Sequence, residues 1–225
     1  MEAISQTQPI KMSEKSENSQ TRLLDAAEVL FAEKGFERTT VRDITTAAHC
    51  NVASINYHFK NKDNLYKEVY VRRVRQLRQI RFTAIDGVMS RGREARLEEL
   101  IGTYARSFLE PLVDTQSGQA VMMLMTREMN EPRLSKEIFF EEMIRPVQER
   151  LEAAIVGLCP EVDAGSVISS IQAIVGQLLH YIRMRELHQA NPQLPVPPET
   201  EAMVEHLVRF SAAGIRAFTG KGPGV

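Results

Sequence analysis

The sequence is poor in the residues that build disulfide frameworks and metal centres. It has two cysteines in 225 residues, Cys50 and Cys159, which are far apart and lack the spacing of metal ligands. A disulfide scaffold or a zinc site would need several cysteines, or cysteine and histidine at short, regular spacings. We therefore expect two reduced thiols and no metal site.

Long apolar runs are also missing. No stretch approaches the roughly 18 to 20 consecutive apolar residues that span a bilayer. The N-terminal residues are polar and lack the apolar run of a signal peptide. These absences predict a cytoplasmic protein without a membrane partner.

Catalytic motifs are equally scarce. The sequence has no glycine-rich phosphate loop and no paired metal-ligand motif. His49 and Cys50 are adjacent, but neighbouring residues rarely form a nucleophile–base pair, and no acidic partner is evident. We expect no enzyme and no cofactor. An enzyme that uses a pocket in the C-terminal part stays as the main alternative outside gene regulation.

Positive charge is concentrated in one region. The net charge is −1, which argues against a protein that compacts DNA without sequence preference. From Lys60 to Arg81, however, eight basic residues stand against two acidic ones, so an anionic partner would meet this region. The arginines at 72, 73, 75 and 78 spread around much of a helix. We expect them to raise the local positive potential and to pair with acidic residues.

The N-terminal third predicts an arm and two helices. Residues 1–19 are polar and aperiodic, which favours a flexible arm. From Thr21 an apolar stripe with helical spacing begins, and Gly35 follows it as a stop signal. Thr40 then precedes a short second stripe, with Asp43 three residues later as in a capping box.

A third short helix has two different faces. Asn51 is a suitable N-cap, and the stretch "VASINYHF" that follows places Val52, Ile55 and Phe59 on one side. An exposed helix side usually carries Lys, Glu or Gln, whereas the opposite side here carries small residues, Tyr57 and His58. This side is therefore predicted to be a contact surface.

The remaining sequence is helical throughout. A long helix over about residues 62–89 precedes segments at about 95–113, 118–130, 135–157, 164–189 and 199–219, separated by proline- and glycine-containing breaks. No segment has the alternation of a β-strand. The predicted fold class is all-α.

The spacing of the second and third helices fits a helix-turn-helix, and the residues make the assignment more specific. Residues 21–66, from "TRLLDAAEVLFAEKGFERTT" to "NYHFKNKDNLY", resemble the N-terminal DNA-binding domain of the TetR family of transcriptional repressors. The resemblance implies, after the arm over 1–19, a helix-turn-helix domain over 20–66 and a helical effector-binding and dimerisation domain over 67–225.

Two positions depart from the family pattern. His49 stands in the turn where members usually have glycine, and His is among the residues that tolerate a left-handed backbone. Asn56 replaces an aromatic residue found in many members, which leaves the base preference open.

The candidate DNA contacts have different roles. Thr40, at a helix N-terminus, and Lys62 are placed to hold phosphates. Ser54, Tyr57 and His58 could reach base edges or neighbouring phosphates, and Ala53 is small enough to contact a thymine methyl. Asn56 lies nearer the flank of the helix, and Arg42 on the outer side of the second helix is a weaker candidate.

The second domain is predicted to dimerise. Residues 166–184 are apolar on more than one face and contain small residues that permit close helix approach. With residues 201–218 they would form a four-helix interface between two copies. An intrachain core is the alternative.

The resemblance also implies that a small effector binds the second domain and alters the separation of the two reading heads. "REMNEP" and the helix through Arg145 and Pro146 resemble the CecR-like subgroup. The candidate effector residues place polar groups, or a methionine, among apolar neighbours; they are Tyr104, Met123, Arg127, His180 and Tyr181. The prediction is a repressor released from a near-palindromic operator by its effector, with an activator of the same fold as the alternative.

Overall fold

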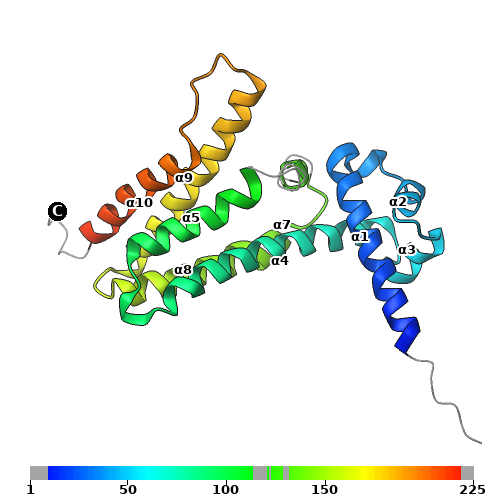
Figure 1. The fold of residues 1–225 in the computed structure, drawn as a ribbon, viewed down its shortest axis with the longest axis horizontal. Coiled ribbons are helices and arrows are strands. Elements are labelled where there is room, and N and C mark those ends of the chain that lie inside the picture. Colours follow the sequence, from blue (N-terminus) through cyan, green and yellow to red (C-terminus); the bar gives the residue numbers. More distant parts are fainter. Residues whose placement is uncertain (1–9, 114–120, 122, 129–131, 219–225) are drawn as a thin grey trace, which may run out of the picture. The chain divides into compact units, whose positions relative to one another are not determined.

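The computed structural model describes residues 10–113, 121, 123–128 and 132–218, with side chains described from residue 18 onward (Figure 1). These residues contain no β-strand, and none of their helices is long and apolar enough to cross a membrane. The helices are α1 (Ile10–Arg38), α2 (Val41–Ala47), α3 (Val52–Phe59), α4 (Lys62–Met89), α5 (Leu97–Val113), α7 (Lys136–Phe139), α8 (Arg145–Leu158), α9 (Ala164–Ala190) and α10 (Thr200–Ala217). The all-α prediction is confirmed.

The chain forms two compact units. Unit 1 is made by residues 1–73 together with 120–135, and unit 2 by residues 74–119 and 136–225. Helix α4 contributes its first part to unit 1 and its second part to unit 2. The segment predicted as a helix over 118–130 lies partly outside the described residues, but residues 123–128 are helical and belong to unit 1.

The predicted flexible arm over residues 1–19 is wrong in its second half. Helix α1 begins at Ile10, so residues 10–19 extend the helix expected from Thr21. This stretch lacks an apolar stripe, but its Lys, Met, Glu and Gln residues have good helix propensity. A helix that is already anchored further along the chain can therefore continue through it. Residues 1–9 lie outside the described residues.

Unit 1 has a core made by α1, α2, α3 and the start of α4. Leu23, Phe31, Ile44, Ile55 and Leu65 are fully buried in it. The ring of Phe31 packs edge-on against that of Tyr66, with 5.1 Å between centroids, and both rings contact Phe36. The aromatic cluster joins the end of α1 to α4.

Gly35 redirects the chain at the end of α1. Its φ of 79° and ψ of 168° break the helical path, and this combination is open almost only to glycine. The helix then continues for one short stretch to Arg38 before Thr39, whose buried hydroxyl donates to the Gly35 carbonyl at 2.7 Å. The stop predicted at Gly35 is thus a sharp kink that leads into α2.

We expect Gly35→Ala to destabilise unit 1 by about 2–3 kcal/mol. An alanine at this position would have to keep a positive φ, and its Cβ would lie 2.9 Å from Nη1 of Arg127. Gly87→Ala is the matched control, because an added Cβ there meets nothing within 4 Å, and it should stabilise α4 by about 0.5–1 kcal/mol. Thermal unfolding followed by circular dichroism measures both; equal melting temperatures for the two variants would contradict the strain at Gly35.

Unit 2 is a layered helix bundle. Helix α5 packs against α10 and α9, and α8 packs against α9 (Figure 1). The packed sides carry the apolar residues expected from helical periodicity, including Leu100, Leu109, Ile155, Leu178 and Leu207.

A π-helical turn, Phe140–Ile144, interrupts the run between α7 and α8. Pro146 lies in the first turn of α8 and has no N–H to donate to the Glu142 carbonyl. Arg78 supplies the missing donor, with Nη1 at 2.8 Å from that carbonyl oxygen. The turn thus has a local cause, and it places Met143 in the core of unit 2.

The arginine-rich part of α4 is paired as expected. Arg72 contacts Asp25 and Glu28 in unit 1, and Arg73 also pairs with Glu28. In unit 2, Arg75 and Arg78 both pair with Glu142, and the Arg75 hydrogen bond holds the pKa of that carboxyl below its usual value. These arginines fasten α4 to its neighbours.

Candidate nucleic-acid interface

Thr40 and Asp43 fix the start of α2. The Thr40 hydroxyl accepts from Asp43 N at 3.1 Å, and Asp43 Oδ2 accepts from Thr40 N at 2.9 Å. These bonds lower the pKa of Asp43 and confirm the predicted capping box. Thr40 is exposed, and its hydroxyl hydrogen can still be donated to a phosphate oxygen.

The turn that follows α2 sets the direction of α3. His49 has a φ of 51°, as its position in place of a glycine predicts. Cys50 N donates to Thr45 O at 2.9 Å, and the Asn51 side chain accepts from Ala53 N at 3.0 Å to cap α3. The two short helices are therefore joined by a turn whose backbone groups are used at both ends.

Helix α3 has one buried and one exposed side. Ile55 and Phe59 are packed into unit 1, whereas Ala53, Asn56 and Tyr57 are exposed, and Tyr57 is 76% exposed. A large aromatic ring held in solvent on a short helix is the strongest sign of a contact surface in unit 1.

Val52 does not lie on the buried side as predicted. Its side chain is 49% exposed. It is the first residue of α3, so the helix has not yet brought this position against the core. Val52 thus joins the exposed side of α3.

His58 is less free than the sequence predicts. Its Nε2 is 2.9 Å from the Ser19 hydroxyl of α1, and the side chain is half-buried. Its ring also packs edge-on against Tyr57, with 4.9 Å between centroids. His58 therefore positions Tyr57 and ties α3 to α1. Ser54 is half-buried as well and reaches the surface only in part.

Lys62 has partners within the domain. Its Nζ donates at 3.0 Å to the carbonyls of Phe36 and of Thr39 and lies 4.0 Å from the centroid of the Phe36 ring. The ammonium thus closes the chain at the end of α1, and its third N–H is left for a phosphate. Lys60, predicted only as part of the basic region, is an exposed cation at the C-terminal end of α3, with a φ of 69°. Arg42 is exposed on α2, where it was expected.

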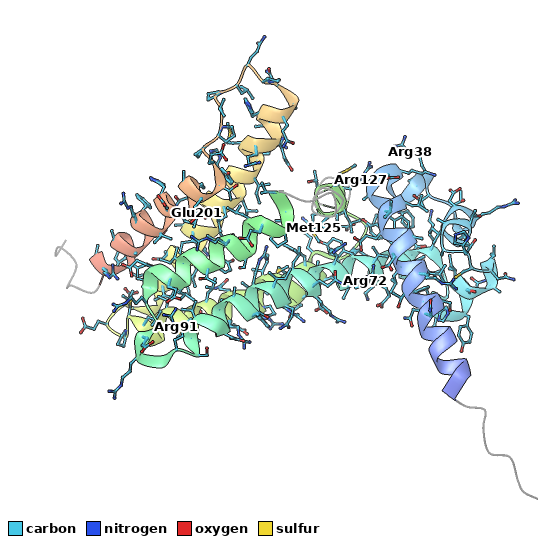
Figure 2. All side chains as sticks on the ribbon, viewed as in Figure 1. Arg38, Arg72, Arg91, Met125, Arg127 and Glu201 are labelled. Carbon is cyan, nitrogen blue, oxygen red and sulfur yellow. The ribbon has the colours of Figure 1, made fainter. Side chains whose placement is uncertain are left out.

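Residues on both sides of the 129–131 gap, Arg127 and Arg133, are fastened to the end of α1. Arg127, labelled in Figure 2, donates from Nε to Ala32 O and from Nη2 to Glu33 O, each at 3.1 Å. The guanidinium of Arg133 lies 4.0 Å from the centroid of the Phe36 ring and pairs with Glu37. These donors satisfy carbonyls that the end of α1 leaves without helical partners.

A buried carboxylate completes this attachment. Glu128 Oε2 accepts from the Tyr66 hydroxyl at 2.7 Å, and Oε1 accepts from the backbone N–H groups of Arg133 at 2.8 Å and of Leu134 at 2.6 Å. Burial, followed by the bond to Glu128, raises the pKa of Tyr66 far above its usual value, so the phenol remains a donor.

The five predicted effector residues are divided between the two units. Arg127 is committed to α1, and Met123 is exposed in unit 1. In unit 2, Tyr181 is buried and donates to Pro198 O at 3.0 Å, while its neighbour His180 is exposed on α9. Only Tyr104 lies deep in unit 2 with its hydroxyl group near another buried polar side chain, that of Arg81. The effector-site assignment of these residues stays a prediction.

Arg81 was not among the residues predicted for the effector site. It is 6% exposed, and it lies near Tyr104 in the core of unit 2. Its neighbours along the helix give the missing signal, because the buried residues Leu77, Ile85 and Val88 form an apolar stripe that Arg81 interrupts.

Comparison with known proteins places both parts of the chain. The family model described as bacterial regulatory proteins of the tetR family matches residues 23–69. The model described as the C-terminal domain of the HTH-type transcriptional dual regulator CecR matches residues 97–215, more than half of the chain.

Curated relatives match through the N-terminal region. The transcriptional repressor KstR2 of Rhodococcus jostii is 47% identical over 49 residues, which are 22% of this chain and 24% of that protein. The negative regulator of the biofilm operon icaADBC, IcaR of Staphylococcus epidermidis, is 38% identical over 47 residues, 21% of this chain and 25% of that protein. The chain thus spans about a quarter of the length of these relatives.

Solved structures share the fold over most of the chain. FadR of Bacillus subtilis, determined in complex with stearoyl-CoA, has a TM-score of 0.64 and 16% identity, covering 87% of this chain and 98% of that one. A TetR-family regulator of Mesorhizobium loti has a TM-score of 0.63 and 16% identity, covering 89% and 96%. With a helix-turn-helix that presents an exposed reading helix, and with both family models matched in order, the chain belongs to the TetR family of transcriptional regulators and carries a CecR-type C-terminal domain.

Proposed function

We propose that the protein is a homodimeric repressor that binds a near-palindromic operator and is released from it by a small effector bound in unit 2. The observation that carries the proposal is the exposed side of α3, where Tyr57, Asn56 and Ala53 project beside the capped N-terminus of the helix. Family and fold are those of regulators rather than of enzymes.

The DNA contacts divide by chemistry. Exposed side chains on α3 suit the major groove, where an amide can read adenine and methyl groups can contact thymine. Thr40 at the N-terminus of α2, the third N–H of Lys62 and the exposed Lys60 suit phosphates on either side. We assign Arg42 and Ser54 to the edge of this surface and His58 to positioning Tyr57.

A second copy of the chain is proposed to cover α9 and α10, which lie side by side in unit 2 (Figure 1). Their exposed sides carry Leu179, 54% exposed, and Phe210, 62% exposed. Exposed small residues also lie on these two helices; they are Ser169, Ala173, Gly176, Ala213, Gly214 and Ala217. A face of this kind permits close helix approach and suits a four-helix interface across a twofold axis.

Repression and release have partial support from the relatives. KstR2 is named a repressor and IcaR a negative regulator, and FadR of Bacillus subtilis was determined with stearoyl-CoA bound. The C-terminal family is described as that of a dual regulator, which favours activation as the second candidate. A reporter fused to the bound promoter separates them, because loss of the gene should raise expression under repression and lower it under activation.

Tyr57→Ala is expected to weaken operator binding by about 10- to 100-fold and to relax sequence preference. The ring is exposed and is held by His58, so its removal takes away a contact without disturbing the core. Fluorescence anisotropy on DNA taken from beside the protein's own gene, compared with scrambled DNA at physiological salt, gives both quantities.

Tyr57→Phe is the matched control, since it keeps the ring and tests the hydroxyl alone. Unchanged affinity and selectivity in Tyr57→Ala would show that α3 does not face the DNA as proposed. Equal binding of the unaltered protein to operator and scrambled DNA would reject the proposed function itself.

A further inference from the structure

A single arginine occupies a core position of unit 2. Leu77, Arg81, Ile85 and Val88 recur at the spacing of one helix face on α4, and each is less than 9% exposed. An arginine at such a position is rarely buried unless it is paired, because taking a guanidinium out of water costs several kcal/mol. The other arginines of this part of α4 reach carboxylates, as Arg75 and Arg78 do with Glu142.

The contacts of Arg81 leave its charge without a counter-ion among the described residues. Its Nη1 lies 2.8 Å from Met143 Sδ, a weak acceptor, and its guanidinium carbon is 4.1 Å from the centroid of the Phe108 ring. Its Nε is buried without a hydrogen-bond partner. No carboxylate in the described part of the chain lies within ion-pair distance of it.

Neither deprotonation of Arg81 nor its contact with the Phe108 ring compensates for the missing counter-ion. Burial lowers the pKa of Arg81, but a guanidinium starts from so high a value that it stays protonated. The cation–π contact with Phe108 offsets part of the desolvation but brings no negative charge to the guanidinium. Tyr104 and Ser107 are the polar side chains buried beside Phe108 on α5, and the Ser107 hydroxyl is occupied by Tyr104 O at 2.7 Å.

We propose that Arg81 anchors the effector, and that the effector is an apolar small molecule with one carboxylate. A carboxylate accepts two parallel N–H bonds from a guanidinium and supplies the charge that the site lacks. Phe108, Met143 and the ring of Tyr104 offer apolar surface to the rest of the molecule. The inference rests on the proposed function and adds the chemical class of the ligand.

The first test needs no ligand. Arg81→Met replaces a buried cation by a neutral side chain of similar length, and we expect it to raise the melting temperature by about 2–10 °C. Arg150→Met is the matched control, because Arg150 is partly exposed and paired with Asp86 at 2.7 Å. A lower melting temperature in Arg81→Met would show that the guanidinium already has a partner within the chain, and would overturn the proposal.

The second test measures binding with defined probes: decanoate, benzoate and phenylacetate, each beside its neutral amide, and phenyl phosphate. We expect at least one carboxylate to raise the melting temperature of the full-length protein while its amide does not. Arg81→Met should bind that carboxylate at least about 30-fold more weakly, and Arg81→Lys should fall between the two. A response to no carboxylate, to the amides equally or to phenyl phosphate alone would overturn the assignment.

The same proteins separate this inference from the proposed function. Arg81→Met without ligand should bind operator DNA as the unaltered protein does, and the active carboxylate should release only the unaltered protein from it. Operator binding that is specific but insensitive to every carboxylate would remove the inference and leave the DNA-binding role in place. Absence of specific DNA binding, with carboxylate binding retained at Arg81, would remove the DNA-binding role and leave the carboxylate site in place.

Discussion

Phe210→Glu is expected to convert the proposed dimer into a monomer and to lower operator affinity by about 100-fold or more. Phe210 is 62% exposed on α10 and stacks on His206, with ring centroids 6.1 Å apart. A carboxylate at this position would be buried against its own symmetry mate, where two like charges cannot both be solvated. Each reading head would then bind its half-site alone and lose the effective concentration that the second head supplies.

Analytical ultracentrifugation and operator binding measure the two effects on the same sample. Ile80→Glu is the matched control, because it places the same charge on an apolar side chain that is 42% exposed, on α4 rather than on α9 or α10. The control should remain dimeric. A Phe210→Glu protein that sediments as a dimer would show that α9 and α10 are not the interface.

Local patterns in the sequence account well for the helices. The helical pattern predicted a long helix over about residues 62–89, and the structure has it at Lys62–Met89. The Thr40–Asp43 pair and Asn51 marked the starts of α2 and α3. These signals are local, because a cap and its partner are separated by two or three residues. The same holds for His49, whose left-handed backbone follows from its place in a turn.

The pairings between distant residues were not predictable in this way. His58 was expected on the DNA-facing side, but its partner Ser19 is 39 residues earlier, in a stretch expected to be a flexible arm. Arg127 was expected in an effector site, but it contacts carbonyls 94 and 95 residues away. A polar side chain among apolar neighbours shows that a partner is needed, and only the fold shows which one it is.

Arg81 shows that such a residue can still be found from its spacing. It belongs to the basic run of α4, in which the preceding Arg75 and Arg78 are paired with Glu142. Its position between Leu77 and Ile85 places it on the buried stripe instead. A charge within an apolar stripe therefore indicates a functional site more sharply than the total charge of a segment.

Glu128→Ala is expected to destabilise unit 1 by about 3–5 kcal/mol and to lower the melting temperature by about 6 °C or more. Glu128 is 8% exposed and accepts from the Tyr66 hydroxyl and from two backbone N–H groups. Alanine leaves the buried Tyr66 hydroxyl and the two part-buried N–H groups without this acceptor. It also frees the segment 123–135 from α4, so operator binding should weaken even though no DNA-facing residue has changed.

Glu128→Gln and Tyr66→Phe separate the parts of this site. Glutamine keeps an oxygen for the two backbone N–H groups, so it should cost about 1 kcal/mol, and Tyr66→Phe combined with Glu128→Ala should cost less than the sum of the two changes.

The raised pKa of Tyr66 adds a pH test. Because the folded state holds the phenol proton more tightly than the unfolded state, stability is full below about pH 10 and falls as the pH rises above it. Urea denaturation below and above that pH should show this fall, and Tyr66→Phe, which has no phenol proton to lose, should show a shallower one; an equal fall in both proteins would show that Tyr66 does not carry the effect.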